Sequence, residues 1–154
     1  MHNPSSLDTP SIQQLYAKYS DAISRNDEKA FASCWADDAT WLLFGLTHQG
    51  KQAILQAYTQ SVAATDFILH LAMSPLISIQ GTSAKVRSQV LEILHFSNGG
   101  AVLLLGHYND ELKKSGGQWL YVSRRFTLRY SGPFSVDDHA FLPLPPEANK
   151  PFDV

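Results

Sequence analysis

Apolar positions in the first part of the chain recur with the period of a helix. Five residues of the segment 11–25 lie three or four positions apart and share one helical face: Ile12, Leu15, Tyr16, Tyr19 and Ile23. Ser11 precedes this stripe and Gln14 follows Ser11 by three positions, which is the pattern of a capping box. Because a buried phenol needs a hydrogen-bond partner, a helix with tyrosines on its inner face is expected to cover a core or to form a pocket wall.

Two further helices and a short strand are predicted before residue 65. Asp27 is expected to cap a helix over residues 28–35. Asp37 and Asp38 are interpreted as turn and capping residues, because adjacent side chains point apart. A strand is predicted over 39–44, a loop over 45–50, and a third helix over 51–64, where apolar residues return at helical spacing.

The second half of the chain alternates between apolar and polar residues, as strands do. The predicted strands cover residues 67–73, 74–80, 83–96, 101–112 and 118–130. Ser-Asn-Gly-Gly at 97–100 and a glycine-containing polar stretch at 113–117 are turn signals. Three helices followed by antiparallel strands predict an α+β fold, in which a strongly bent sheet wraps a long helix and leaves a cone with an apolar interior.

The strand predicted over residues 83–96 has two distinct faces. One face carries Arg87, Gln89, Leu91, Ile93 and His95. The other carries Val86, Ser88, Val90, Glu92 and Leu94. We expect His95, with Leu91 and Ile93, to face the interior, and the valine-rich face to be the outer one, buried against another subunit.

Length and composition fit one globular domain. The chain has 154 residues, of which 44% are hydrophobic, enough for a sizeable core. We expect the domain to cover residues 11–131, between a flexible arm at 1–10 and a proline-rich tail at 132–154.

Charge and motif content exclude several classes of function. The net charge of −2 and the pI near 6.3 argue against nucleic acid and membrane partners, both of which select a basic surface. Cys34 is the only cysteine, so neither a disulfide within the chain nor a thiolate metal cluster is expected. No zinc, phosphate-loop or serine-hydrolase motif occurs, and we expect no metal and no cofactor. The first residues lack the pattern of a signal peptide, so a cytoplasmic protein is expected.

A set of motifs along residues 12–130 carries a resemblance to a known family. The set comprises Tyr19, Asp27, residues 35–39, Gly50 with Ala53 and Ile54, His70, residues 106–108 with Asp110, and Gly117 with Trp119 and Arg125. In order and spacing it resembles the SnoaL-like branch of the nuclear transport factor 2-like superfamily. The resemblance implies a cone-shaped barrel, usually a homodimer or homotrimer, often without a metal or organic cofactor. Members include dehydratases, isomerases, polyketide cyclases and noncatalytic subunits.

Within this family the sequence is similar to the scytalone dehydratase and bile-acid dehydratase branch. His70 matches the first pocket histidine of that branch and His95 falls on the second. The family aspartate that works with a histidine is replaced by Ser24. A serine supplies no negative charge to hold an imidazolium. Asp21, about one helical turn earlier, is the candidate substitute.

These residues predict a cofactor-independent dehydratase or isomerase acting on a small cyclic or aromatic hydroxy or keto compound. The candidate catalytic residues are His70, His95, Asp21 and Tyr19. The candidate substrate-binding residues are Tyr108, Trp41, Ser24, Leu91 and Ile93. Histidine suits proton transfer near neutral pH, and a tyrosine hydroxyl can steady a developing enolate.

Less specific interpretations remain open for these residues. Each histidine could instead satisfy a backbone group inside the barrel, and Asp21 could lie in solvent on the outer helix face. A noncatalytic subunit that binds a ligand or a partner protein is a second hypothesis, motivated by Ser24 and by the valine-rich face. Polyketide-cyclase-like chemistry is a third.

Overall fold

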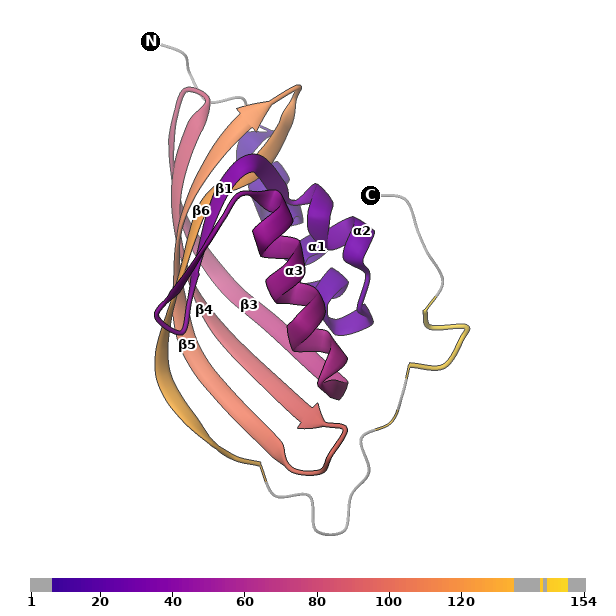
Figure 1. The fold of residues 1–154 in the computed structure, drawn as a ribbon. Helices are drawn as coiled ribbons and strands as arrows, with labels where there is room; N and C mark the ends of the chain where they lie inside the picture. Colours follow the sequence, from indigo (N-terminus) through magenta and orange to yellow (C-terminus); the bar gives the residue numbers. More distant parts are fainter. Residues whose placement is uncertain (1–6, 135–141, 143, 150–154) are drawn as a thin grey trace.

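The predicted α+β fold, a strongly bent sheet over three helices from the N-terminal part of the chain, is confirmed. The computed structural model describes residues 7–134, 142 and 144–149. The helices are α1 (Asp8–Arg25), α2 (Glu28–Ser33) and α3 (Lys51–Ala63). The strands are β1 (Trp35–Leu43), β2 (Leu46–Gln49), β3 (Thr65–Gln80), β4 (Ser83–Phe96), β5 (Ala101–Ser115) and β6 (Gln118–Pro133). All three helices lie on the concave side of the curved sheet (Figure 1).

The six strands form one mixed sheet in the order β2-β1-β6-β5-β4-β3. Only the β1–β6 pair is parallel, and the other neighbours are antiparallel. Strands β2 and β3 are the two edges, so the sheet is open rather than closed into a barrel. The predicted cone is therefore formed by the curved sheet together with the helices, which cover the side that the sheet leaves open (Figure 1).

Helix α1 buries the predicted apolar stripe but begins earlier than predicted. It starts at Asp8, so residues 8–10 of the predicted arm are helical, while residues 1–6 lie outside the described residues. The buried Asp8 carboxylate accepts hydrogen bonds from Lys114 Nζ (2.6 Å) and Trp119 Nε1 (3.1 Å), which anchors this turn to the sheet. Pro10 is tolerated there because first-turn N–H groups have no partner within the helix. Ser11 is not the cap, and its hydroxyl donates to the Leu7 carbonyl.

The predicted cap of α2 is confirmed, whereas the prediction for the next segment is wrong. The Asp27 side chain accepts a hydrogen bond from the Ala30 N–H at 2.9 Å. Strand β1 already begins at Trp35, and Asp37 and Asp38 lie within it, not in a turn. Both carboxylates face solvent and pair with lysines from neighbouring elements. Residues 46–49, predicted as loop, form β2.

The strand β3 joins two predicted strands, and the faces of β4 are the reverse of those predicted. Ala84, Val86, Ser88 and Val90 are buried, so their face of β4 meets the helices. The face with Leu91, Ile93 and His95 is therefore the convex one. Period-two alternation separates two sets of residues but does not say which set meets the helices.

The core beneath the helices is rich in aromatic rings. Phe31 of α2 stacks on Tyr58 of α3 with ring centroids 4.1 Å apart. Cys34 is fully buried next to this cluster, and burial raises the pKa of its thiol to about 11. Among the described residues, no helix combines the length and hydropathy that crossing a membrane requires.

Candidate functional site

His70 lies on the concave face of β3 and is held at both ring nitrogens. Its side chain is buried, with Nδ1 2.9 Å from Ser20 Oγ and Nε2 2.9 Å from the Tyr108 hydroxyl. Its backbone N–H donates to Ser24 Oγ at 3.0 Å. Helix α1 and strand β5 thus fix the orientation of the ring from opposite sides.

The environment keeps His70 uncharged. Burial, and secondarily the positive charge of Arg124, lower the pKa of His70 to about 3. At neutral pH one ring nitrogen therefore donates a hydrogen bond and the other accepts one. The ring can therefore orient the hydroxyl groups of Ser20 and Tyr108, but at neutral pH it does not store a proton.

Asp21, the predicted partner of the His70 ring, does not contact it. Asp21 lies on the outer face of α1, where its side chain is about half exposed and accepts a hydrogen bond from Arg25 Nε at 2.8 Å. Ser24 reaches the backbone of His70 and not its ring. The residue that contacts the ring is Ser20, one helical turn before Ser24. Ser20 lies four residues before Ser24, so both serines face β3 from the same side of α1, and this spacing could have pointed to Ser20.

The predicted histidine pair does not form. His95 lies on the convex face of β4, where Nδ1 is 2.5 Å from Asp66 Oδ1. Leu91 and Ile93 share that face, so the expectation that these three residues line the cavity is wrong. The number of residues between His70 and His95 matches the family pair, but His95 lies on the face of β4 that points away from the cavity.

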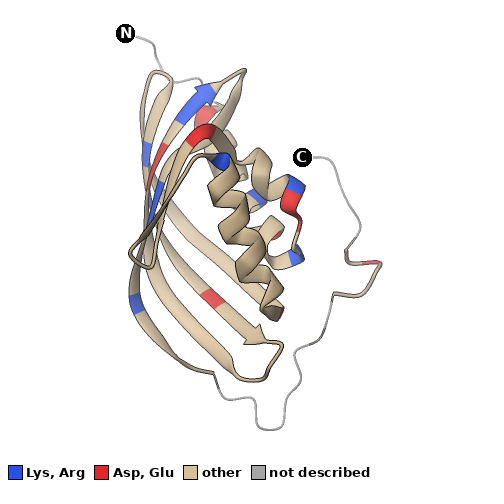
Figure 2. Ribbon diagram, in the orientation of Figure 1, with Lys and Arg blue, Asp and Glu red and all other residues tan. Residues whose placement is uncertain are grey.

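A cavity of about 100 Å³ lies between the concave face of the sheet and helices α1 and α3. Of the predicted residues, His70, Tyr19, Tyr108 and Trp41 line it. Most of the remaining wall is apolar or aromatic. Helix α3 has no Asp, Glu or Arg, and its one lysine is at its first residue, so it is tan over most of its length in Figure 2. A small, mostly apolar ligand fits such a lining.

Glu92 is the residue that sequence reasoning missed at this cavity. It lies on β4 directly opposite His70 and lines the same space. Burial raises the pKa of its carboxyl to about 7. The signal in the sequence is a single carboxylate on the face that carries Val86, Val90 and Leu94, but the sequence predicts that this face is the outer one.

Tyr19 and Tyr108 bring phenol hydroxyls to the cavity. The Tyr19 hydroxyl is buried beside the Arg124 guanidinium, and its O–H finds no acceptor among the described residues. Its ring is T-shaped to His70, with centroids 5.4 Å apart. Burial raises the pKa of both phenols, so both remain protonated and able to donate. A buried donor without a partner is suited to an oxygen atom of a ligand.

A buried ion pair supports this wall from behind. Arg124 donates two hydrogen bonds to Asp110, at 3.0 and 2.9 Å, and both side chains are fully buried. The guanidinium lies 3.7 Å from the centroid of the Tyr108 ring and 4.2 Å from that of Tyr19. Arg125, the neighbouring arginine that belongs to the family motif set, is exposed.

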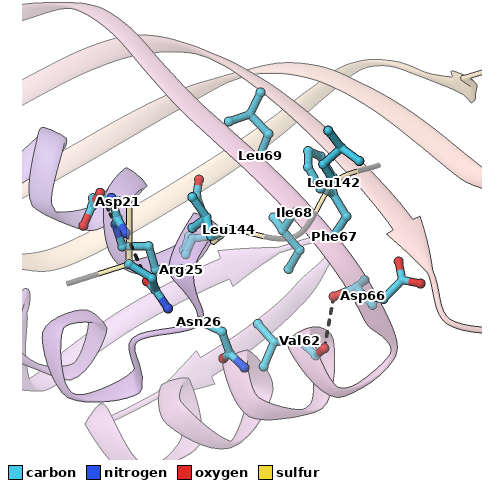
Figure 3. Close-up of a pocket in the computed structure, with 14 residues that line it drawn as sticks. Asp21, Arg25, Asn26, Val62, Asp66, Phe67, Ile68, Leu69, Leu142 and Leu144 are labelled. Carbon is cyan, nitrogen blue, oxygen red and sulfur yellow. Dashed lines mark hydrogen bonds and ion pairs between the residues drawn. The ribbon is translucent and has the colours of Figure 1, made fainter. Parts of the chain in front are cut away.

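An open groove of about 460 Å³ adjoins the cavity on the outer side of α1. Figure 3 shows Asp21 and Arg25 of α1 on one side of the groove, Leu142 beside Phe67 of β3 on the other, and Leu144 between them. Three residues line both the groove and the inner cavity: Ile23, Val62 and Ile68. The two spaces are therefore separated by a single layer of aliphatic side chains.

No cluster of three or more His, Cys, Asp or Glu side chains that could hold a metal ion occurs within residues 7–134, 142 and 144–149. The polar side-chain groups at the cavity are one carboxyl, one neutral imidazole, the indole N–H of Trp41 and hydroxyl groups. This set can donate and accept hydrogen bonds and can move a proton.

Comparisons with known proteins give the family. Residues 4–125 match the SnoaL-like domain. The gamma-hexachlorocyclohexane dehydrochlorinase of Sphingobium indicum is 24% identical over 129 residues, covering 80% of this chain and 82% of that protein. A candidate scytalone dehydratase from Novosphingobium aromaticivorans has a TM-score of 0.78 at 21% identity, covering 84% of this chain and 89% of that one. A type 3 hexachlorocyclohexane dehydrochlorinase from Novosphingobium barchaimii has a TM-score of 0.77 at 21% identity, covering 88% and 94%. The structural matches show the fold, and the domain match shows that the chain belongs to the SnoaL-like family.

Proposed function

We propose that the protein is a cofactor-independent enzyme that moves protons on a small cyclic or aromatic hydroxy or keto compound, as a dehydratase or an isomerase does. The observation that carries the proposal is the neutral His70 ring, fixed by Ser20 and Tyr108 at the wall of a small, mostly apolar cavity. The names of the related proteins support it, because dehydratase and dehydrochlorinase both denote an elimination.

The geometry suits a substrate oxygen that becomes negative during the reaction. Removal of a proton beside a carbonyl group places charge on the carbonyl oxygen. The buried Tyr19 O–H, which has no acceptor in the described part of the chain, can donate to that oxygen. In a site with few polar groups such a hydrogen bond is stronger than in water. His70 keeps the Tyr108 hydroxyl in place beside it.

Two small ketones that are converted to the same product can be used as substrates to test the proposal. Loss of water from 3-hydroxycyclohexanone and isomerisation of cyclohex-3-enone both give cyclohex-2-enone, which is followed by ultraviolet absorbance. We expect the wild type to accelerate one of these conversions. His70→Gln is expected to lower kcat/KM by about 10- to 100-fold, because the fixed hydrogen bonds of the site are lost.

His95→Gln is the matched control, since it removes a histidine from the convex face of the same sheet. It is expected to leave kcat/KM unchanged. Equal losses in the two variants, or no loss with His70→Gln, would contradict the role of His70. Saturable binding of the ketones with no conversion would instead favour the noncatalytic binding subunit.

We also propose that a second copy of the chain covers the convex face of the sheet. Leu71, Leu91, Leu105 and Tyr130 lie in register across β3, β4, β5 and β6 on that face. Leu71 is 40% exposed and Tyr130 is 48% exposed, which leaves an apolar stripe in contact with water. One stripe that meets its own copy is the simplest self-complementary contact.

The oligomeric state is expected to depend on this stripe. In sedimentation velocity the wild type should be a dimer or trimer, and Leu71→Lys should shift it toward the monomer, because a lysine would have to be buried in the contact. Leu46→Lys is the control, since Leu46 is also exposed but lies on β2 at the other edge of the sheet. A monomeric wild type, or dissociation by Leu46→Lys alone, would contradict this contact.

A further inference from the structure

We propose that Glu92 is the catalytic residue that takes up and returns the proton in this cavity, and that its substrate is an uncharged ring compound. The inference rests on the proposed function and deepens it, because it separates the group that moves the proton from the groups that hold the oxygen. The family resemblance had placed proton transfer on histidines.

The position of Glu92 is the first argument. In the sheet it is the direct neighbour of His70 on β3 and of Leu104 on β5. Its side chain lines the cavity together with those of Tyr19 and Tyr108. Within the described part of the chain its carboxyl makes no hydrogen bond and no ion pair. A carboxyl group inside a cavity and without a protein partner is available to a ligand.

The charges around Glu92 are the second argument. The titratable groups that face the cavity region are Tyr19 of α1, Tyr58 of α3, His70 of β3, Tyr108 and Asp110 of β5, and Arg124 of β6. The histidine and the phenols are neutral at pH 7, and Asp110 and Arg124 neutralise one another. Burial therefore dominates and raises the pKa of Glu92 to about 7, so both of its protonation states are populated at neutral pH. His70, whose pKa is about 3, is a far weaker base.

The proton balance is closed by Glu92 alone. The carboxylate takes a proton from a substrate carbon beside a carbonyl group, the C–H electron pair forms the C=C bond of an enolate, and the π pair of the carbonyl group moves onto its oxygen. The carboxylic acid then returns this proton. When the proton goes to the hydroxyl group on the β carbon, the oxygen pair of the enolate re-forms the carbonyl group and the enolate C=C pair forms the double bond between the α and β carbons. The bond from the β carbon to the hydroxyl oxygen breaks, water is released, and a conjugated enone remains. When the proton returns to a different carbon of the enolate, the double bond changes position and the product is an isomer of the substrate.

The same carboxylate selects the charge of the substrate. An anionic ligand would meet a carboxylate in a poorly solvated space, and no cation among the described lining residues would offset the repulsion. Arg124 does not supply that charge, because Asp110 binds it through two hydrogen bonds. Neutral rings with a hydroxy or keto group are the class that fits.

The ring opening of 1,2-benzisoxazole tests Glu92 as a base independently of the natural substrate. A base takes the proton from the ring carbon C3, the C–H pair forms the nitrile, the N–O bond breaks and 2-cyanophenolate is released, which is followed by its absorbance. We expect the wild type to accelerate this reaction, with a rate that rises with pH about a midpoint near 7. Glu92→Gln is expected to lower the rate at least 100-fold.

Two control variants distinguish the loss of the base from a loss of folding. Glu92→Asp keeps a carboxyl on a shorter side chain and is expected to retain a measurable, pH-dependent rate. Glu111→Gln, on an exposed position of β5, is expected to change nothing. Absence of ring opening by the wild type, equal rates with Glu92→Gln, or a midpoint near 4.5 would overturn the assignment.

The outcomes also separate this inference from the proposed function. Ring opening that depends on Glu92, without any conversion of the two ketones, would leave Glu92 as a base and reject the dehydratase or isomerase activity. Conversion of a ketone that is unchanged in Glu92→Gln would support the activity and reject Glu92.

Discussion

Asp110→Asn is expected to lower the free energy of unfolding by about 3 to 5 kcal/mol. The carboxylate of Asp110 accepts two hydrogen bonds from Arg124 and one from the Tyr16 hydroxyl. The amide keeps the shape of the side chain but removes its negative charge. The fully buried guanidinium would then have no counter-charge, and an unpaired buried charge is far more costly than a lost surface pair.

Urea unfolding followed by circular dichroism measures this loss. Glu111→Gln is the matched control, because it neutralises the adjacent carboxylate on the exposed face of the same strand. It is expected to change the free energy of unfolding by less than about 0.5 kcal/mol. If the two variants were equally stable, the ring faces of Tyr19 and Tyr108 would be sufficient to hold Arg124 without Asp110.

The free energy of unfolding is expected to fall as the pH rises from about 4.5 to about 7, because of Glu92. The pKa of this carboxyl is about 7 in the folded protein, against an ordinary value of 4.5 in an unfolded chain. Between these values the folded state binds more protons than the unfolded state, so raising the pH favours unfolding. At 1.36 kcal/mol for each pH unit the loss approaches about 3 kcal/mol, and above pH 7 it is complete.

Glu92→Gln removes this contribution, because an amide does not titrate. Urea unfolding at pH 5 and at pH 8 should show a smaller fall in stability for the variant than for the wild type. The variant should also be more stable than the wild type at pH 8, where the wild type carries a partly buried carboxylate in the cavity. The same fall in both proteins would show that Glu92 titrates as an ordinary surface carboxyl.

The helices and strands were mostly predictable because local chemistry determines them. The stripe from Ile12 to Ile23 makes α1 amphipathic in any context, and Asp27 caps α2 through a backbone group only three residues away. The errors fell where distant contacts decide. Asp8 extends α1 because Lys114 and Trp119 bind it from the far end of the sheet. Asp37 and Asp38 have the composition of a turn, but pairing with β6 draws β1 back to Trp35.

The candidate site was predictable only in part, for the same reason. The sequence predicts His70 and Tyr108 for one site, and the structure shows them in contact. It also put His95 in the cavity, but the direction of its side chain depends on which face of β4 meets the helices. Because the other face of β4 meets the helices, Glu92 lines the cavity in place of the predicted His95, Leu91 and Ile93. A single sequence does not show it, because both sets alternate equally well.

Cys34 makes the protein well suited to spectroscopy of its outer groove. The chain has one thiol, and that thiol is fully buried with a raised pKa, so thiol-directed dyes and spin labels should not react with it in the folded state. A single cysteine introduced at the exposed Leu144 would therefore carry the sole label. Its emission or line shape would report ligand entry beside the aliphatic layer of Ile23, Val62 and Ile68 without further changes to the sequence.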